Sequence, residues 1–257
     1  MAPYDMPRIL LIDIETSPNK TYTWGLFKQN IALNQIEEPG RTICWSARWV
    51  GEKDVLFKSV HEHGVLEMVQ GAWALLDQAD IVVHYNGVSF DVPTLNKEFL
   101  YANIGPPASY QQIDLYRVIR RNFRLASYKL DFVCPFLGIG AKLNHKGMEL
   151  WRDCMAGDNK AWRVMERYNK QDVKLTGMLY KRLLPWISNH PSVTVYDDTR
   201  DTIACPTCGS SSIQKRGFKY TKVLRYQRYY CNACGSWSQS RSSSVPADQR
   251  RTILKPV

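Results

Sequence analysis

Three short acidic motifs, widely separated along the chain, constrain the fold more than any other feature of the sequence. The first, RILLIDIETSP, carries Asp13 and Glu15 at the end of an apolar run that begins after Arg8. The second, HYNGVSFDVP, carries Asp91, and the third, RYNKQDVKL, carries Asp172. Carboxylates that meet in a fold repel one another unless cations hold them together. The fold is therefore expected to bring the motifs together around divalent cations.

Each motif taken alone also has an ordinary structural explanation. An Asp-x-Glu sequence after a strand is common, and Asp91 before Pro93 fits a helix-capping turn. Tyr168 and Asp172 lie four residues apart, so they share one helix face, as many solvent-facing pairs do. The order of the motifs, and their places beside expected strand ends and helix starts, favour a common site.

The apolar pattern predicts strands in the first half of the chain and mainly helices in the second, an α/β or α+β layout. Because side chains alternate along a strand, Asp13 and Glu15 are expected to project from the same face. The expected strands lie at residues 8–14, 42–50, 54–60, 81–85 and 112–115, and the second and third form a hairpin. The expected helices lie at residues 65–78, 93–101, 115–123, 127–137, 148–155 and 160–184.

Together the motifs resemble those of the DEDD, or DnaQ-like, 3′→5′ exonucleases. IDIET resembles their first motif, HYNGVSFD their second and YNKQD their third, and Tyr168 stands where another branch carries His, which indicates the tyrosine (DEDDy) subclass. Residues 127–139, SYKLDFVCPFLGI, are similar to a helix of the proofreading domains of family B DNA polymerases. The resemblance covers roughly residues 8–185. It implies a ribonuclease H-like α/β fold, with a mixed central sheet flanked by helices.

The resemblance also implies two Mg²⁺ or Mn²⁺ ions, which suit an all-oxygen ligand set. Asp13 is expected to bridge both ions. Glu15 and Asp172 are expected to hold the ion that activates water, and Asp91 the ion at the leaving oxygen, directly or through water. Tyr168 is expected to orient the attacking water, because a phenol with a pKa of ~10 is a poor base at neutral pH.

Other residues near the motifs have weaker signals. Asn86 is expected to contact the terminal nucleotide, whereas His84 and His145 are expected to be structural. The segment Trp24–Phe27 follows the first motif and has two interpretations: it stacks on the scissile nucleotide, or it packs beneath a loop.

Four cysteines form a second pattern near the C-terminus. Cys205 and Cys208 make one Cys-x-x-Cys turn, Cys231 and Cys234 make another, and a glycine follows each turn. Two such turns supply four thiolates to one tetrahedral Zn²⁺, as in zinc ribbons. With every position filled by protein, this zinc is expected to be structural. The remaining three cysteines are expected to be small buried apolar residues.

Between the two turns, the segment KRGFKYTKVLRYQRYY alternates basic and aromatic residues, as a hairpin with one basic face and one packed face does. The residues expected to follow a phosphate backbone are Lys215, Arg216, Lys219, Lys222, Arg225 and Arg228. Those expected to stack on bases are Phe218, Tyr220, Tyr226 and Tyr229. The alternative is a ribbon that binds a protein partner or packs on the catalytic domain.

Charge supports a polyanionic partner. The net charge of the chain is +10, and residues 196–257 carry 11 Lys/Arg against 4 Asp/Glu. The expected domains are a catalytic domain at residues 1–195, a zinc ribbon at 196–240 and a flexible basic tail at 241–257. No apolar run reaches the length of a membrane span and no signal-peptide layout is present, so a cytoplasmic protein without a membrane partner is expected.

The sequence thus predicts a 3′→5′ exonuclease that acts on nucleic acid, with single-stranded DNA or a 3′ overhang preferred and RNA as the other substrate. Two alternatives stay open. One is a structure-specific endonuclease on the same fold, and the other is a non-catalytic adaptor that binds nucleic acid or a polymerase through the ribbon.

Overall fold

The computed structural model describes residues 6–255, so residues 1–5 and 256–257, the outer ends of the predicted catalytic domain and tail, lie outside the described residues. Two compact units are present: Arg8–Tyr180, and residues 181–255 together with residues 6–7. No helix of the described chain has the length and hydrophobicity that a membrane crossing requires.

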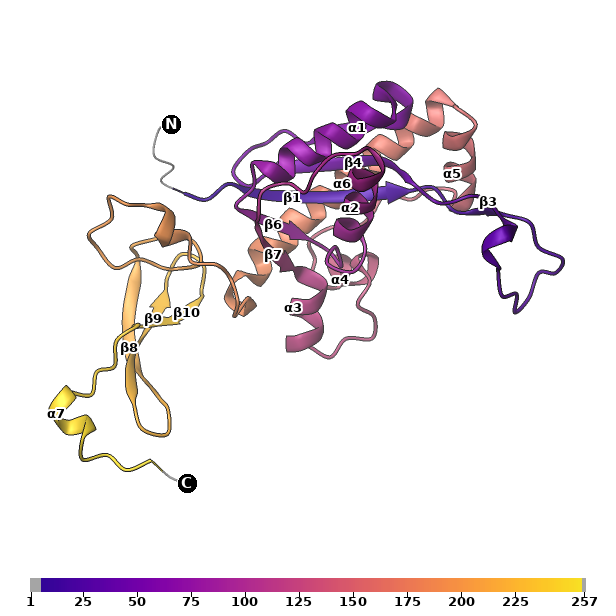
Figure 1. The fold of residues 1–257 in the computed structure, drawn as a ribbon. Helices are drawn as coiled ribbons and strands as arrows, with labels where there is room; N and C mark the ends of the chain where they lie inside the picture. Colours follow the sequence, from indigo (N-terminus) through magenta and orange to yellow (C-terminus); the bar gives the residue numbers. More distant parts are fainter. Residues whose placement is uncertain (1–5, 256–257) are drawn as a thin grey trace. The chain divides into compact units, whose positions relative to one another are not determined.

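The first unit is built on a five-stranded sheet. Its strands are β1 (Ile9–Thr16), β4 (Thr42–Trp49), β5 (Leu56–Ser59), β6 (Ile81–His84) and β7 (Gln111–Asp114), in the order β5-β4-β1-β6-β7. β1 pairs antiparallel with β4 and parallel with β6, so the sheet is mixed. Figure 1 shows β1 at its centre, which places the first acidic motif in the middle of the unit.

The predicted helices are all present, with small changes at their ends. They are α1 (Val60–Asp77), α2 (Asp91–Tyr101), α3 (Leu115–Asn122), α4 (Leu130–Phe136), α5 (Met148–Met155) and α6 (Asn159–Leu183). α1 begins one turn before the predicted start. Ser59 caps that turn by accepting a hydrogen bond from the Glu62 N–H, and Gly64, with φ of 72°, breaks the helix before its regular part.

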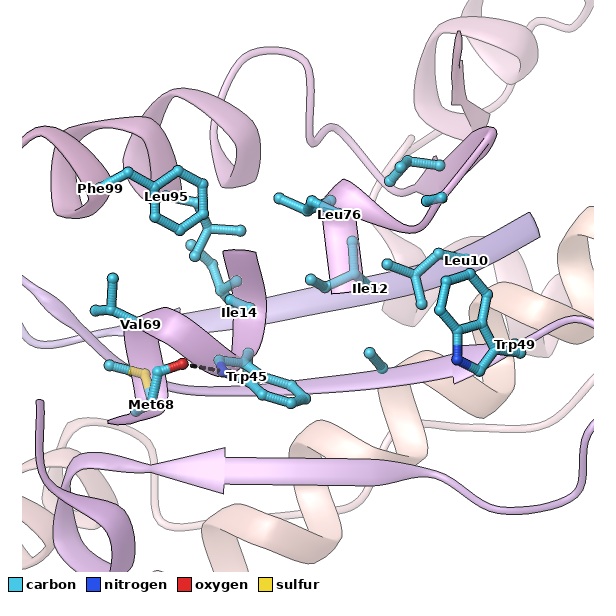
Figure 2. Packing of buried hydrophobic residues seen from close by; sticks show 14 residues of the cluster. Leu10, Ile12, Ile14, Trp45, Trp49, Met68, Val69, Leu76, Leu95 and Phe99 are labelled. Carbon is cyan, nitrogen blue, oxygen red and sulfur yellow. Dashed lines mark hydrogen bonds between the residues drawn. The ribbon is translucent and has the colours of Figure 1, made fainter. Parts of the chain in front are cut away.

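Alternation along β1 gives the sheet two different faces. Leu10, Ile12 and Ile14 pack with Trp45 and Trp49 of β4 and with residues of α1 and α2, as Figure 2 shows. Within this core the indole N–H of Trp45 donates to the carbonyl oxygen of Met68 at 2.7 Å. The other face of β1 carries Asp13 and Glu15, as predicted, and the Asn169 side chain of α6 donates to Asp13.

A surface excursion separates β1 from β4. It contains β2 (Lys20–Thr21), a 3₁₀ turn (Leu33–Gln35) and β3 (Ile36–Glu38), and β2 pairs with β3 (Figure 1). The Trp24, Leu26 and Phe27 side chains are 100%, 91% and 84% exposed. They do not pack beneath a loop, so that interpretation of the segment is wrong.

The second unit holds the cysteine module. Its sheet has the order β10-β9-β8, from β8 (Ile213–Tyr220), β9 (Arg225–Cys231) and β10 (Trp237–Gln239). It also includes two 3₁₀ turns, Leu184–Trp186 and Val193–Tyr196, and all of their residues except Tyr196 lie in the range expected for the catalytic domain. The Val193 N–H donates to the Pro206 carbonyl at 2.7 Å, and the Ser236 hydroxyl to the Leu184 carbonyl at 3.2 Å. These bonds tie the two turns to the cysteine module.

The residues expected to form a flexible tail have local structure in their described part. The Ser244 N–H donates to the Arg225 carbonyl of β9 at 2.7 Å, Val245 is buried, and a short helix, α7 (Ala247–Arg250), follows. The segment beyond β10 therefore continues along β9 before it reaches α7.

Candidate active site and cysteine cluster

Three of the four predicted carboxylates lie together. Asp13 and Glu15 come from β1 and Asp172 from α6, and each offers an oxygen within 4.8 Å of the others. β1 presents its two acids on one side because they are two residues apart. Asp172 is buried and faces them from α6, one helical turn after Tyr168. The sequence order of the motifs thus becomes a spatial cluster.

Burial and mutual repulsion raise the pKa values of these acids. The pKa of Asp13 lies well above its ordinary value, because the group is desolvated and faces Asp91, Glu15 and Asp172. Desolvation, then the charge of Asp172, raises the pKa of Glu15 to about 8. Burial also raises the pKa of Asp172, although Lys142 opposes the shift. A bound cation would therefore stabilise the ionised form of these carboxyl groups.

Asp91 lies beside this group of three. It begins α2, its side chain is buried, and one carboxylate oxygen accepts the backbone N–H of Ile14 at 3.2 Å. Ile14 stands between Asp13 and Glu15 on β1, so this bond ties the second motif to the first. Burial raises the pKa of Asp91 to about 7, while the bond from Ile14 lowers it.

Two residues of the site were missed by the sequence analysis. The Lys142 ammonium lies 2.6 Å from a carboxylate oxygen of Asp172 and 3.0 Å from the hydroxyl of Tyr168. The fully buried Asn169 amide donates to an oxygen of Asp13 at 2.7 Å. Asn169 is adjacent to Tyr168 in the third motif, so its place in the motif could have identified it as a site residue. Lys142 lies in an irregular segment between α4 and α5, where no periodicity marks it.

The surroundings of Tyr168 favour the protonated form of its hydroxyl. Desolvation, followed by the charge of Asp172, raises its pKa further above the ordinary value. The rings of His145 and Trp151 meet the Tyr168 ring edge-on, with centroids 4.8 and 6.2 Å away. His145 therefore supports the ring, consistent with the structural role expected of it.

A cleft of about 350 Å³ opens at the cluster. Asp13, Asn86 and Lys142 line it together with Lys129, Leu130, Asp131 and three tyrosines: Tyr85, Tyr116 and Tyr128. Asn86 adopts a left-handed backbone conformation, with φ of 66°. Its N–H donates to an oxygen of Asp114 at 3.0 Å, and this bond holds it at the cleft.

The contacts of His84 are those of a residue that stabilises the fold. It is fully buried, Nδ1 accepts the Gly87 N–H at 3.0 Å, and Nε2 lies 3.1 Å from the side-chain oxygen of Gln112. A Cβ at Gly87 would lie 2.4 Å from the His84 ring, so the turn after β6 requires glycine there.

The acidic cluster fits divalent cations on chemical grounds. Its donors are oxygens only, and one oxygen of Asp172 is buried with no hydrogen-bond partner in the described chain. An unpaired buried carboxylate oxygen is costly, and a cation is its natural partner. The neighbouring Asn169 side-chain oxygen is also buried and unpartnered within the described residues.

The four cysteines meet as the sequence predicts. The sulfurs of Cys205 and Cys234 are 3.6 Å apart, and those of Cys208 and Cys231 are 3.7 Å apart. Four thiolates at ~2.3 Å from a tetrahedral Zn²⁺ lie about 3.8 Å from one another, so these spacings fit zinc. Gly209 and Gly235 both have φ of 75° and close the two turns. Cys44, Cys134 and Cys154 are buried, as expected.

The predicted nucleic-acid contacts of the ribbon divide between two faces of its sheet. Lys215, Arg216, Lys219, Lys222 and Arg228 are exposed, while Arg225 is half-buried with its guanidinium 4.7 Å from the Phe218 ring centre. Lys222 lies in the turn between β8 and β9. The expectation of one basic face and one packed face is wrong, because cations occur on both.

The raised pKa values predict a pH-dependent response to Mg²⁺. The folded, metal-free chain keeps protons on Glu15 and Asp91 up to about pH 8 and 7, whereas unfolded carboxyls lose theirs near ~4. The native state therefore binds more protons than the unfolded state across this window, and its stability falls as pH rises. We expect added Mg²⁺ to raise the melting temperature more at about pH 8 than at about pH 6. A Mg²⁺-induced shift of the same size at both pH values, measured by calorimetry, would contradict this.

Comparisons with known proteins agree with this geometry. A family model described as the RNase_H superfamily matches residues 10–184, from β1 through α6. Among solved structures, a family B DNA polymerase from the hyperthermophilic archaeon Pyrobaculum calidifontis is similar with a TM-score of 0.55 and 15% identity. The similarity covers 86% of this chain but 32% of that polymerase, so the chain spans about a third of its length. No curated protein matches the sequence. The likeness to the polymerase shows a shared fold, and the family model covers more than half of the sequence: the chain belongs to the RNase_H superfamily.

Proposed function

We propose that the protein is a metal-dependent 3′→5′ exonuclease of the tyrosine subclass. The observation that carries the proposal is the convergence of Asp13, Glu15 and Asp172, with Tyr168 one helical turn from Asp172. Superfamily membership supports a nuclease at the coarser level. Polarity and subclass rest on the likeness of the three motifs to those of the DEDD exonucleases.

The acidic residues would hold two Mg²⁺ or Mn²⁺ ions. In this assignment Asp13 would be shared between both ions, Glu15 and Asp172 would hold one of them, and Asp91 would hold the other. When bound, such ions lower the pKa of a coordinated water and stabilise the negative charge that develops at the phosphate. Asn169 fixes the rotamer of Asp13 through its 2.7 Å bond, and Ile14 does the same for Asp91 through its N–H.

Tyr168 is assigned to the attacking water. Its phenol remains protonated at neutral pH because burial raises its pKa, so it does not act as a base. A protonated hydroxyl can both donate and accept a hydrogen bond, which suits a group that orients water. The aromatic contacts from His145 and Trp151 hold its ring in one place.

The size of the cleft supports an unpaired substrate. About 350 Å³ lies within the range of small-ligand sites, a size that suits an unpaired terminal nucleotide. The three tyrosines and Asn86 on its walls offer aromatic faces and one amide to a terminal nucleotide. We therefore propose single-stranded DNA or a 3′ overhang as the preferred substrate, with RNA as the alternative.

A cleavage time course tests the proposal. Single-stranded DNA and RNA of equal sequence, labelled at either end, are incubated with Mg²⁺, with Mn²⁺ or without either ion. A ladder that shortens from the 3′ end only when an ion is present supports the exonuclease. Cleavage of a circular single strand would instead identify an endonuclease, and no cleavage of any substrate would leave the adaptor interpretation.

Lys142 provides a second test of the same site. Its ammonium contacts Asp172 and Tyr168, so it orders both and places positive charge beside the reacting phosphate. We expect Lys142→Met to lower kcat by about 10²-fold, a typical loss for one electrostatic contact in an active site. The matched control is Lys146→Met, because that exposed lysine pairs with Glu149 outside the cleft. Equal activity of the two variants would show that Lys142 has no catalytic role.

A further inference from the structure

The two faces of the ribbon sheet carry different side chains. On β9, Arg228 and Tyr230 project from one face, and Arg225 and Tyr229 from the other. Residues paired directly across strands share a face, so Trp237, opposite Tyr230, belongs with the first set. We call this the Trp237 face, and it comprises Gln214, Arg216, Lys219, Tyr226, Arg228, Tyr230, Trp237 and Gln239. The opposite, Phe218 face comprises Ile213, Lys215, Phe218, Tyr220, Arg225, Gln227 and Tyr229.

Cations and rings alternate across the Trp237 face. The Arg216 guanidinium lies 5.1 Å from the ring centre of Tyr230, and the Arg228 guanidinium lies 5.1 Å from that of Trp237. The rings of Tyr230 and Trp237 are themselves 5.3 Å apart. A bulge in β8, where Gly217 has φ of 63°, sets two residues of β8 against Arg228 and lets Arg216 join this row.

The row is open to solvent. Trp237 is 51% exposed, although it is the largest side chain of the sheet, and Arg216, Lys219 and Arg228 are exposed. An exposed tryptophan beside three cations is a surface with both a π-face and unneutralised charge. The Phe218 face differs, because its Arg225 is half-buried against Phe218 and carries a buried Nε atom.

Within residues 6–255, no carboxylate forms an ion pair with these cations. The sequence contains no Asp or Glu between Asp201 and Asp248, a stretch with seven Lys/Arg. None of the seven forms an ion pair within the described chain. The region therefore lacks the acidic partners that ordinarily accompany surface cations, and an external polyanion is the group that would supply them.

We propose that the Trp237 face binds unpaired nucleic acid. Bases stack on Trp237, and Arg216, Lys219 and Arg228 contact the phosphates on either side. An acidic peptide would satisfy the cations but would leave the exposed indole without a planar partner. A duplex would present phosphates but keep its bases stacked inside. This binding site shares no residue with the acidic cluster, and the proposal does not depend on the exonuclease activity.

The test uses the full, zinc-loaded chain carrying Asp13→Asn, so that no substrate is degraded during the measurement. Binding of labelled single-stranded oligothymidine is followed by fluorescence anisotropy over a range of salt. We expect Trp237→Ala to weaken binding about 5- to 150-fold, the effect of losing one stacked base, and Trp237→Phe to retain most of the affinity. Lys219→Gln is expected to reduce the slope of log K against log salt by about 0.7.

The Phe218 face supplies matched controls on the same sheet. Tyr220, which is 69% exposed, and Lys215 are the counterparts of Trp237 and Lys219. The proposal restricts the contacts expected from the sequence to the Trp237 face, so it removes Tyr220 and Lys215 from that set. Tyr220→Ala and Lys215→Gln are therefore expected to change affinity by less than about 2-fold, with zinc content equal in all variants. Equal losses on both faces would overturn the proposal in favour of diffuse charge. Tighter binding of polyglutamate than of oligothymidine would overturn it in favour of a protein partner.

Discussion

Asp13→Asn is expected to remove nuclease activity while making the metal-free protein more stable. Asp13 would be the ligand shared by both ions, and losing several kcal/mol of charge stabilisation corresponds to about 10³-fold in kcat. The stability gain follows from the same geometry. Burial and three neighbouring carboxylates raise the pKa of Asp13, so a neutral amide of equal size relieves desolvation and repulsion. Asparagine can still accept the bond from Asn169.

Two measurements on one preparation check this result. Activity is measured with Mg²⁺ on 3′-labelled single strands, and the melting temperature is measured without any divalent ion. Glu67→Gln is the matched control, because this exposed carboxylate lies on α1, on the other face of the sheet. A fall in melting temperature together with the loss of activity would mean that Asp13 has a structural role instead.

Loss of zinc is expected to unfold the ribbon and to leave the unit Arg8–Tyr180 folded. Cys208→Ser removes one of the four sulfurs, and structural zinc sites contribute roughly 10–16 kcal/mol to the folding of small zinc modules. The ribbon has few buried apolar side chains apart from its cysteines, so the remaining contacts would not hold it. The five-stranded sheet and its helices form a separate compact unit and should remain folded.

Zinc analysis and limited proteolysis measure this effect. We expect the unaltered protein to contain one zinc per chain and to resist proteolysis in the segment that follows residue 204. We expect the variant to lose the metal and to be cleaved within that segment. Cys154→Ala is the control, since it removes a buried thiol outside the cluster. The idea fails if Cys208→Ser keeps its zinc, or if it loses activity on short single strands as completely as Asp13→Asn does.

Local patterns were sufficient to predict the main strands and the helices, whereas the meeting of the acidic motifs was expected from their order and from the family resemblance. Alternation along one strand placed Asp13 and Glu15 on the same side, and a helical turn placed Tyr168 with Asp172. The cysteine cluster was equally predictable, because two Cys-x-x-Cys turns, each followed by glycine, are typical of a zinc ribbon. These inferences concern residues whose geometry is set by their immediate neighbours in sequence.

Features that depend on irregular backbone were not predictable in this way. Lys142 reaches the site from a segment without repeating structure, and no spacing rule connects it to Asp172 thirty residues later. The β-bulge at Gly217 shifts the register between β8 and β9. For that reason Phe218 and Tyr220 lie on one face and Tyr226 on the other, although the sequence analysis grouped them together. Trp237 was not among the predicted contacts, because it lies on β10 and reaches the row of arginines and rings only through the pairing of β10 with β9.

The length of β6 determines whether the acidic residues of β1 lie at an open edge of the sheet. The parallel pairing of β6 with β1 runs from Ile9 and Ile81 to Leu11 and Val83, and β6 ends one residue later at His84. From Ile12 onward, that side of β1 has no paired strand among residues 6–255. The Asp91 carboxylate accepts the Ile14 N–H, which a strand would otherwise accept. A β6 longer by two residues would extend the ladder past Asp13 and displace Asp91. Truncation of one strand thus creates the opening, and an acid supplied by the following helix terminates the ladder.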